Sequence, residues 1–450
     1  MERSVEIRDA VDSRPPAGRL LLLAAQHVLS MYAGAITVPL VVAGALKLSP
    51  VDTGFLVSAS LLTSGLVTII QCVGFGPFGI RLPLVMGVTF VGALPAVAIA
   101  SGSSYGLAEV FGASIIAGIA GLLFVPLMSR LSHVLTPVVT GTAMLLIGVS
   151  LVAVAADWSA GGQGAADYGA PDHLFVAAIT CLTILAISRF GKGFFGATAI
   201  LSGMAVGFAV AALMGKVAPV SFAQASWVAL PTLGRMGLPH FDVLASATMT
   251  VVMLITLIES SGMLMLLGRV AGRPVDGPAL SRGLRTDALG AILGGLLGSF
   301  PCTSYSQNIA LVGLTGVASR WVCAVAGALL VVLAMLPKLG LLVAALPPSV
   351  LGGAGVVLFG MVAAAGIHSL AEVDYSEPGR LTVVAVSLAL GLVPMFRPAL
   401  FDQLPENLTP LLQNGMLIGI VSAIALNAFF TRRGRKPSSS ATASPALIEN

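Results

Sequence analysis

The sequence predicts an all-α, polytopic membrane protein with 14 transmembrane segments in two inverted 7-span repeats. Three observations lead to this prediction: the composition, the number of apolar segments, and two broken segments that lie seven spans apart. Of the 450 residues, 57% are hydrophobic and 9% are charged, and the mean hydropathy is +0.99. A water-soluble core does not need so much apolar length, whereas a bilayer requires about 20 apolar residues for each helical span.

Fourteen apolar segments are long enough, or nearly so, to cross a bilayer. They cover residues 20–46, 54–75, 82–100, 106–127, 134–156, 174–190, 197–217, 243–268, 284–299, 302–318, 320–346, 349–370, 381–396 and 410–430. With both termini inside, 18 of the 23 Lys and Arg residues fall on the inner face, as the positive-inside rule favours. The outer face keeps Lys47, Lys216, Arg235, Lys338 and Arg397. The net charge of +4 reflects these loops and does not indicate nucleic-acid binding.

The ends of the chain are polar. Residues 1–19 carry charges of both signs and lack the short apolar core of a signal peptide, so we expect a cytoplasmic N-terminal segment. Residues 431–450 begin with basic residues and become rich in Ser, Ala and Pro, which predicts a disordered cytoplasmic tail. The four cysteines lie in apolar segments without metal-ligand spacing, so we expect no metal site.

The third and tenth segments are interrupted by polar stretches, residues 81–90 and 299–308, which contain Pro83 and Pro301. Non-helical backbone at membrane depth is tolerated only where it is buried in protein or lines a cavity. Broken segments at corresponding positions of two halves point to a transporter's binding site. The loop 216–242 divides the chain into halves of seven spans, so the second half must insert upside down relative to the first.

Nearly all acidic residues fall in loops, and Glu259 is the exception. A charge near the bilayer centre costs about 2.5–3.5 kcal/mol on insertion scales, so such residues usually face a cavity and have a function. We favour that reading over a protonated Glu that only bonds two helices, because Ser260 and Ser261 make this turn small and polar. Asp287 lies near the start of the ninth segment, where helix capping and a functional role are equally compatible with the sequence.

Other polar residues within the apolar segments form a second group of candidates. Gln26 and His27 lie in the first segment, where a helix–helix hydrogen bond is favoured over direct ligand binding. Gln307 and Asn308 open a half-helix and offer both donors and acceptors, although Asn308 could serve only to close the break. Phe90 could stack on a planar ring or simply fill the core.

Together a carboxylate and an amide fit a planar heterocycle that presents adjacent N–H and C=O groups. Glu259 can also carry a proton, so protonation and substrate binding would be coupled through this residue.

These residues stand in motifs that resemble the nucleobase–ascorbate transporter family, also called nucleobase:cation symporter family 2. The resemblance covers about residues 20–430, and its motifs are residues 26–34, 86–90, 259–262 and 307–316. The last motif matches the family signature of Gln, Glu or Pro, then Asn, any residue, Gly, four further residues, Thr, and Arg, Lys or Gly. Ala310 replaces its Gly. The whole set in this order is highly specific.

The resemblance implies a core domain, residues 20–127 and 243–346, and a gate domain, residues 134–217 and 349–430. It also implies short β-like strands in the two breaks, a homodimer, elevator-type movement of core against gate, and a multi-pass location in the bacterial inner membrane with both termini cytoplasmic. The transported partners would be a nucleobase and a proton, with no cofactor and no enzymatic activity. The implied substrate-binding residues are Glu259, Gln307, Phe90, Ser306 and Thr89. The residues implied in coupling and site geometry are His27, Asp287, Asn308 and Gln26.

Gln307 resembles the purine branch, whose members take xanthine or uric acid, whereas the uracil branch usually has Glu at this position. Two residues depart from the family pattern. Met263 replaces an Asp that many relatives carry one turn beyond Glu259, which leaves Glu259 as the expected proton carrier there. Ala310 adds a methyl group where we expect the helix to pack closely, with consequences for pocket shape and substrate choice.

Alternatives of other classes fit less well. A uracil or pyrimidine permease of the same family differs chiefly at position 307. An anion exchanger of the same fold would have to bind its anion beside Glu259, whose carboxylate would repel it. A membrane-embedded enzyme needs a nucleophile–base pair or a metal cluster, and the five His residues have no ligand spacing. A channel would require polar faces along many helices, which the apolar segments lack.

Overall fold

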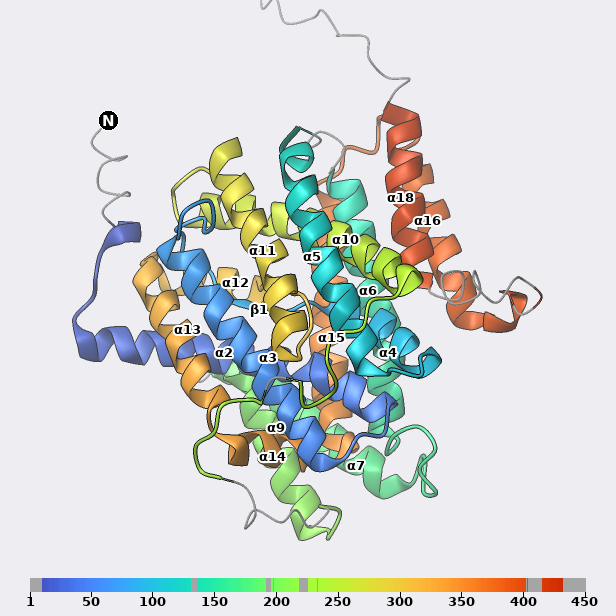
Figure 1. Ribbon diagram of the computed structural model, residues 1–450. Helices are drawn as coiled ribbons and strands as arrows, with labels where there is room; N and C mark the ends of the chain where they lie inside the picture. Colours follow the sequence, from blue (N-terminus) through green and yellow to red (C-terminus); the bar gives the residue numbers. More distant parts are fainter. Residues whose placement is uncertain are drawn as a thin grey trace, which may run out of the picture.

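The structure is a computed structural model that describes residues 10–130, 136–191, 196, 198–217, 226–232, 234–401, 403 and 415–431. Within these residues the chain is a bundle of apolar helices around one pair of short strands (Figure 1). Residues 432–450 of the expected tail, residues 1–9 of the N-terminal segment and parts of the loops 191–198 and 216–242 lie outside the described residues.

The first half of the described chain contains α2 (Ala17–Ala45), α3 (Pro50–Val73), β1 (Met86–Val88), the 3-10 turn η1 (Phe90–Gly92), α4 (Ala93–Gly102), α5 (Leu107–Arg130), α6 (Pro137–Ser159), α7 (Pro171–Phe190) and α9 (Ala199–Leu213). The second contains α10 (Val243–Val270), α11 (Gly277–Leu297), β2 (Cys302–Ser304), α12 (Ser306–Thr315), α13 (Arg320–Ala334), α14 (Pro337–Ala344), α15 (Pro348–Ala371), α16 (Arg380–Phe396), η2 (Pro398–Phe401) and α18 (Gly415–Thr431).

Seven of the described helices are long and apolar enough to span a membrane, or eight if the bent pair α13–α14 counts as one span. Shorter apolar helices, among them α9, α16 and α18, fall within the other expected segments. The chain is therefore a multi-pass membrane protein, while the full set of fourteen spans and their inverted repeat stay predictions. The eleventh segment, 320–346, was expected to be continuous, but it bends by 81° between α13 and α14. Pro337 begins α14, and a proline is favoured at a helix start but breaks a helix interior.

Polar side chains and prolines set several helix starts. The Ser49 hydroxyl accepts from the Asp52 N–H at 3.2 Å directly before Pro50, and Asp242 caps α10 by accepting from the Ala245 N–H at 2.8 Å. These contacts satisfy N–H groups that a helix start leaves free.

The helices contact one another in two groups. Helices α2, α3, α5, α10, α11, α13 and α14 pack together, and α6, α7, α9, α15, α16 and α18 form the other group. Glycines permit the closest approaches: a Cβ at Gly65 of α3 would lie 2.6 Å from the Gly327 carbonyl oxygen of α13. Figure 1 shows α16 and α18 together at the periphery of the bundle, away from the strands. Movement of one group against the other stays a prediction.

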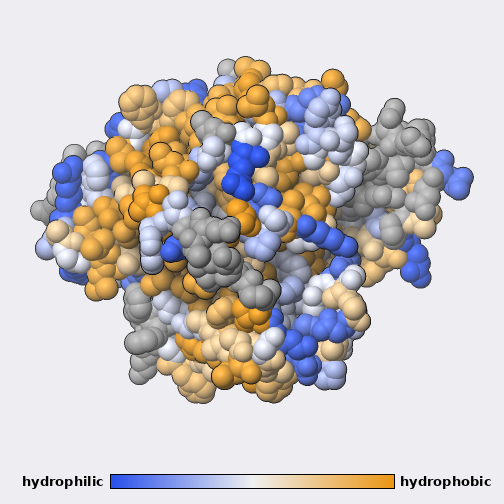
Figure 2. Space-filling model, turned by 60° about the horizontal axis from the view of Figure 1, so that its bottom comes forward, coloured by the Kyte–Doolittle hydropathy of each residue, from blue (hydrophilic) through white to orange (hydrophobic). Residues whose placement is uncertain are grey.

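The outer surface is rich in apolar side chains. Leu123, Phe190, Leu213 and Phe396 are each at least 66% exposed, and Figure 2 shows hydrophobic residues over much of the face it draws. Exposed apolar area on this scale is typical of a surface that contacts lipid rather than water.

Candidate functional site

The two broken segments meet and pair in the interior. β1 and β2 form a two-stranded antiparallel sheet in which Met86 lies opposite Ser304 and Val88 lies opposite Cys302. All six strand residues are buried, and Figure 1 shows β1 inside the bundle near α11 and α12. The bonds from the Thr89 N–H to the Pro301 carbonyl (2.8 Å) and from the Tyr305 N–H to the Val85 carbonyl (3.3 Å) extend the pairing. The expected strands in the breaks are therefore present.

Side chains satisfy the backbone groups that the strands leave unpaired. The Asn308 side-chain oxygen accepts from the Val85 N–H at 2.8 Å, and the Thr68 hydroxyl accepts from the Met86 N–H at 2.9 Å. The Tyr305 hydroxyl donates to the Val88 carbonyl at 3.0 Å. Buried backbone groups without partners are costly, so these bonds hold both breaks in place. The interpretation of Asn308 as a residue that closes the break is consistent with this contact.

Helix α10 contacts both breaks through one of its faces. The Thr256 hydroxyl lies 3.4 Å from that of Thr89, and the Ser260 hydroxyl lies 3.0 Å from that of Thr303. Thr256 and Ser260 are four residues apart and therefore lie on the same side of the helix. Glu259 flanks this side and is partly exposed. Among the described residues its carboxylate has no hydrogen bond or ion pair, so it is free to accept from a ligand.

Gln307 is the second residue of α12 and is also partly exposed. Its side-chain oxygen accepts a long bond of 3.5 Å from the Ser306 hydroxyl, and within the described chain its amide nitrogen donates to no group. The preceding Tyr305 offers no side-chain cap, so the first N–H groups of α12 also remain available. The start of α12 thus presents donors and an acceptor close to the strands.

Three aromatic rings lie beside these polar groups. The rings of Phe90 and Tyr305 are nearly parallel, at 12°, with centroids 6.3 Å apart. Phe359 of α15 meets Phe90 edge-on at 6.0 Å, so Phe90 lies where the two helix groups touch. Aromatic faces next to hydrogen-bonding groups suit a flat, polar-edged ligand.

His27 and Gln26 are buried in α2. The His27 ring nitrogen Nδ1 bonds to the Asn308 side-chain amide, so His27 supports a residue that closes a break, in keeping with the predicted helix–helix hydrogen bond. Gln26 lies at the neighbouring position, and its role in site geometry stays a prediction.

Asp287 does not cap a helix. Helix α11 begins ten residues earlier, and its cap is Asp276, which accepts from the Ala279 N–H at 2.7 Å. Asp287 lies in the middle of α11, fully buried, and neither carboxylate oxygen has a hydrogen-bond partner in the described chain. Ser260 and Glu259 lie close enough to Asp287 to affect it electrostatically. The capping alternative is therefore wrong, and a second carboxylate lies behind Glu259.

The two departures from the family pattern lie in different surroundings. Met263 is 8% exposed and packs in the core one turn beyond Glu259. Ala310 is exposed, so the prediction that its methyl group lies at a close contact between helices is wrong.

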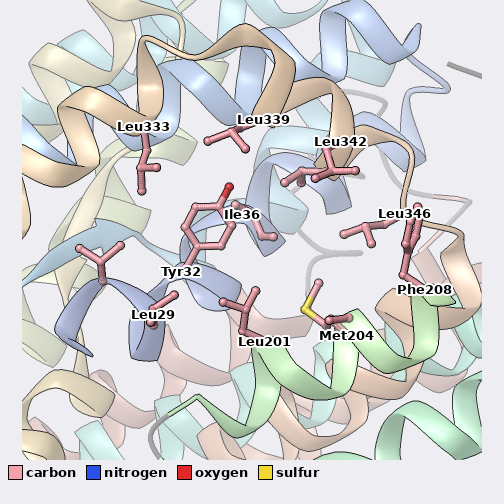
Figure 3. A pocket seen from close by; sticks show the side chains of 13 residues that line it. Leu29, Tyr32, Ile36, Leu201, Met204, Phe208, Leu333, Leu339, Leu342 and Leu346 are labelled. Carbon is pink, nitrogen blue, oxygen red and sulfur yellow. The ribbon is translucent and has the colours of Figure 1, made fainter. Parts of the chain in front are cut away.

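A separate cavity of about 420 Å³ lies between α2, α9 and the bent pair α13–α14 (Figure 3). Its lining is apolar except for the Tyr32 hydroxyl, which projects into the space (Figure 3). A ligand with several polar edges would lose its hydrogen bonds there, so this cavity does not suit a nucleobase. In the part of the chain that the structure describes, no group of His, Cys, Asp and Glu side chains is arranged to hold a metal ion.

Residues 18–400 match the sequence profile of a family described as "Permease family", with the short name Xan_ur_permease. The chain is 43% identical over 424 residues to the uric acid transporter UacT of Escherichia coli, covering 94% of this chain and 88% of that protein. It is 38% identical over 413 residues to a xanthine permease of Bacillus subtilis, covering 92% and 94%. The chain belongs to the nucleobase–ascorbate transporter family.

Among solved structures, the transmembrane domain of the cyanobacterial bicarbonate transporter BicA aligns with a TM-score of 0.58 at 15% identity, covering 92% of this chain and 98% of that one. At this identity the likeness shows the fold alone. The fold of this member of the nucleobase–ascorbate transporter family is therefore that of a membrane transporter.

Three residues at the site were not predicted from the sequence: Tyr305, Phe359 and Thr256. Tyr305 lies within the polar stretch 299–308, and an aromatic residue inside the break could have identified it as a candidate from the sequence. Nothing in the local sequence marks Phe359, which reaches Phe90 only through the fold.

Proposed function

We propose that this protein is a proton-coupled nucleobase symporter that imports a purine base, xanthine or uric acid. The observation that carries the proposal is the unpaired Glu259 carboxylate on the flank of the α10 face that contacts both breaks. Glu259 would accept from ring N–H groups, and Gln307 would exchange hydrogen bonds with a neighbouring carbonyl edge. Phe90, which is partly exposed and packs against the buried Tyr305 ring, would cover a flat face of the base.

A buried carboxylate is costly in its charged form, so Glu259 gains from either a proton or a ligand N–H. For symport the proton and the base must be bound together, so one Glu259 oxygen would hold the proton while the other accepts from the ring N–H. Asp287, buried behind Glu259 without a hydrogen-bond partner among the described groups, is the second site at which a proton would reside. Sodium is the alternative coupling ion, and the uptake experiment below separates the two.

The purine assignment has two supports. Relatives that cover over nine-tenths of this chain are named for uric acid and xanthine, and Gln307 differs from the Glu expected in the uracil branch. A uracil permease is the first alternative. An anion exchanger is the second, because the fold resembles a bicarbonate transporter and the start of α12 is uncapped, but the free Glu259 carboxylate would repel an anion there.

In this proposal the group of helices around α10 and α12 moves against the group around α6 and α15, and the protein works as a homodimer in the inner membrane with both termini inside. Phe90 and Phe359 lie at the boundary between the two groups, where such a movement would open the site.

The test is uptake of radiolabelled xanthine, uric acid and uracil into proteoliposomes with an imposed proton gradient, with and without an uncoupler and with sodium varied. We expect saturable purine uptake that the uncoupler abolishes and that sodium does not change. Glu259→Gln should lose accumulation against the gradient while retaining some binding. The matched control is Glu372→Gln, since Glu372 is an exposed residue at the end of α15. Unimpaired accumulation by Glu259→Gln refutes the coupling role.

A further inference from the structure

A second cavity, of about 820 Å³ and with both polar and apolar lining, lies between the two helix groups. We call it the Lys47 cavity. Its lining comes from the end of α2, from α4, from the end of α6 with the loop that follows, and from the start of α15: Val41, Gly44, Ala45, Lys47, Leu94, Val97, Val154, Asp157, Trp158, Gly161, Gly162, Gln163, Gly164, Ala165 and Pro348. It is therefore distinct from the apolar cavity at Tyr32.

One wall of the Lys47 cavity comes from the helix that follows Phe90. Leu94 and Val97 are four and seven residues beyond Phe90 on the turn and helix that begin at Phe90. At 1.5 Å per residue this places them about 6 and 10 Å along the helix axis from Phe90. The cavity is therefore close to the candidate binding site.

Lys47 has an unusual backbone conformation. Its φ is +51°, and Lys47 and Arg81 are the two non-glycine residues with positive φ in the described chain. It follows the end of α2, a position that glycine usually fills because a Cβ is disfavoured there. The helix end holds this conformation, since the Lys47 N–H donates to the Gly44 carbonyl at 3.2 Å and the Leu48 N–H to the Ala43 carbonyl at 3.0 Å.

The Lys47 ammonium group also lacks a counter-ion. The other described cations assigned to the same face have partners: Lys216 lies 3.5 Å from Asp167 and 3.3 Å from Asp172, Arg235 lies 3.1 Å from Asp52, Lys338 lies 3.7 Å from the Trp227 ring centroid, and Arg397 donates to the Phe396 carbonyl at 3.0 Å. Among the described groups the exposed Lys47 side chain has no ion pair and no hydrogen bond. Its Nζ would lie 3.8 Å from a Cβ at Gly164, so the side chain reaches across the cavity to the opposite wall.

Asp157, the acidic residue of the cavity lining, is hydrogen-bonded to neighbouring side chains. The Asp157 carboxylate accepts from the Gln163 amide at 2.9 Å and from the Tyr168 hydroxyl at 2.8 Å, one bond to each oxygen. Trp158, the next residue, contributes an aromatic ring to the same wall. The cavity thus offers a free cation on one side and an aromatic ring with a hydrogen-bonded carboxylate on the other.

We propose that the Lys47 cavity captures the purine before it reaches Glu259 and Gln307, and that Lys47 favours an anionic purine, the urate monoanion, over a neutral one. This inference rests on the proposed function. Uric acid is mainly a monoanion in mildly acidic buffer, whereas xanthine is mainly neutral there, and the ammonium group discriminates between them by charge. The urate monoanion would then bind beside Glu259 only when that carboxyl carries the coupling proton, so the charge at Lys47 acts before the protonated site does.

The test measures initial rates of urate and xanthine uptake into proteoliposomes for the parent protein and for Lys47→Gln, Lys47→Gly and Lys47→Arg. Lys47→Gly removes the charge and suits the positive φ, so it separates charge from folding. We expect KM for urate to rise about fivefold in the Gln and Gly variants, with kcat unchanged. An exposed ion pair between Lys47 and urate would strengthen binding by at most about this factor. KM for xanthine should not change, and Lys47→Arg should keep the parent's KM for urate.

The matched control is Lys338→Gln, which removes another lysine of the same face without touching the cavity. Added salt should raise KM for urate in the parent and in Lys338→Gln, but much less in Lys47→Gln. An unchanged KM for urate in both Lys47→Gln and Lys47→Gly, equal changes for the two bases, or transport of xanthine without urate would overturn the inference. Failure of the proposed function looks different, because the parent itself would then transport neither base.

Discussion

Gly87→Ala tests whether the paired breaks set the geometry of the site. Gly87 is the middle residue of β1, and the Tyr305 ring lies directly over its backbone. A Cβ at this position would lie 2.3 Å from Cζ of Tyr305 and 2.6 and 2.7 Å from its two Cε atoms. Carbon atoms do not approach so closely, so either the ring or the strand must move.

The cost follows from what holds the ring. Tyr305 is 2% exposed, and its hydroxyl donates to the Val88 carbonyl at 3.0 Å, so the ring has no open space to enter. Overpacking in a filled core costs about 1–3 kcal/mol, and loss of a buried hydrogen bond adds about 1 kcal/mol. We therefore expect Gly87→Ala to lower the stability by about 2–4 kcal/mol and to displace the ring that faces Phe90.

Thermal unfolding in detergent measures the loss of stability. The rate of purine uptake shows whether displacement of the Tyr305 ring affects transport. Gly92→Ala is the matched control, because its Cβ would meet a nearest atom at 3.6 Å, an ordinary contact. Tyr305→Leu in the Gly87→Ala background removes most of the overlap and should restore part of the lost stability. Parent-like melting and uptake in Gly87→Ala would refute the idea that the Tyr305 ring is fixed against β1.

Two further substitutions address the start of α12. Gln307→Glu should shift base preference away from oxopurines, because it replaces the side-chain amide donor with an acceptor; an unchanged competition profile across purines and pyrimidines would exclude a substrate role. Asn308→Ala leaves the buried Val85 N–H without a partner and should cost about 1–3 kcal/mol of stability, seen as a lower melting temperature; Asn308→Gln, which keeps a neutral amide for Val85 and His27, should lose less, and equal losses in the two variants would contradict this reading.

The sequence predicted the breaks because their signal is local. Pro83 and Pro301 interrupt apolar segments, and a polar backbone at membrane depth must find partners, so the two stretches were expected to be buried together. Asn308 was predicted to close a break on the same grounds, and its bond to Val85 does so.

Features that depend on distant residues or on exact helix ends could not be predicted in this way. Asp287 was placed near a helix start because the ninth apolar segment begins at residue 284, yet α11 continues back to Gly277 and its cap is Asp276. Hydropathy marks where a helix enters lipid, not where it begins. Contact between Phe90 and Phe359 joins residues far apart in the chain, and no periodic pattern carries that information.

Some polar side chains at the breaks form hydrogen bonds with the backbone of the strands, and others form none. Asn308, Thr68 and Tyr305 each bond to the backbone of β1 or its flanks, and changing them exposes a buried N–H or C=O group. Glu259 and Gln307 lie beside the same strands, yet no described backbone group depends on their side chains. The chain retains a carboxylate and an amide at membrane depth, where both are costly, without using them to close the fold. In the proposed function a ligand that bonds to both side chains would offset that cost, so we expect stability and transport to respond to different substitutions within the same few residues.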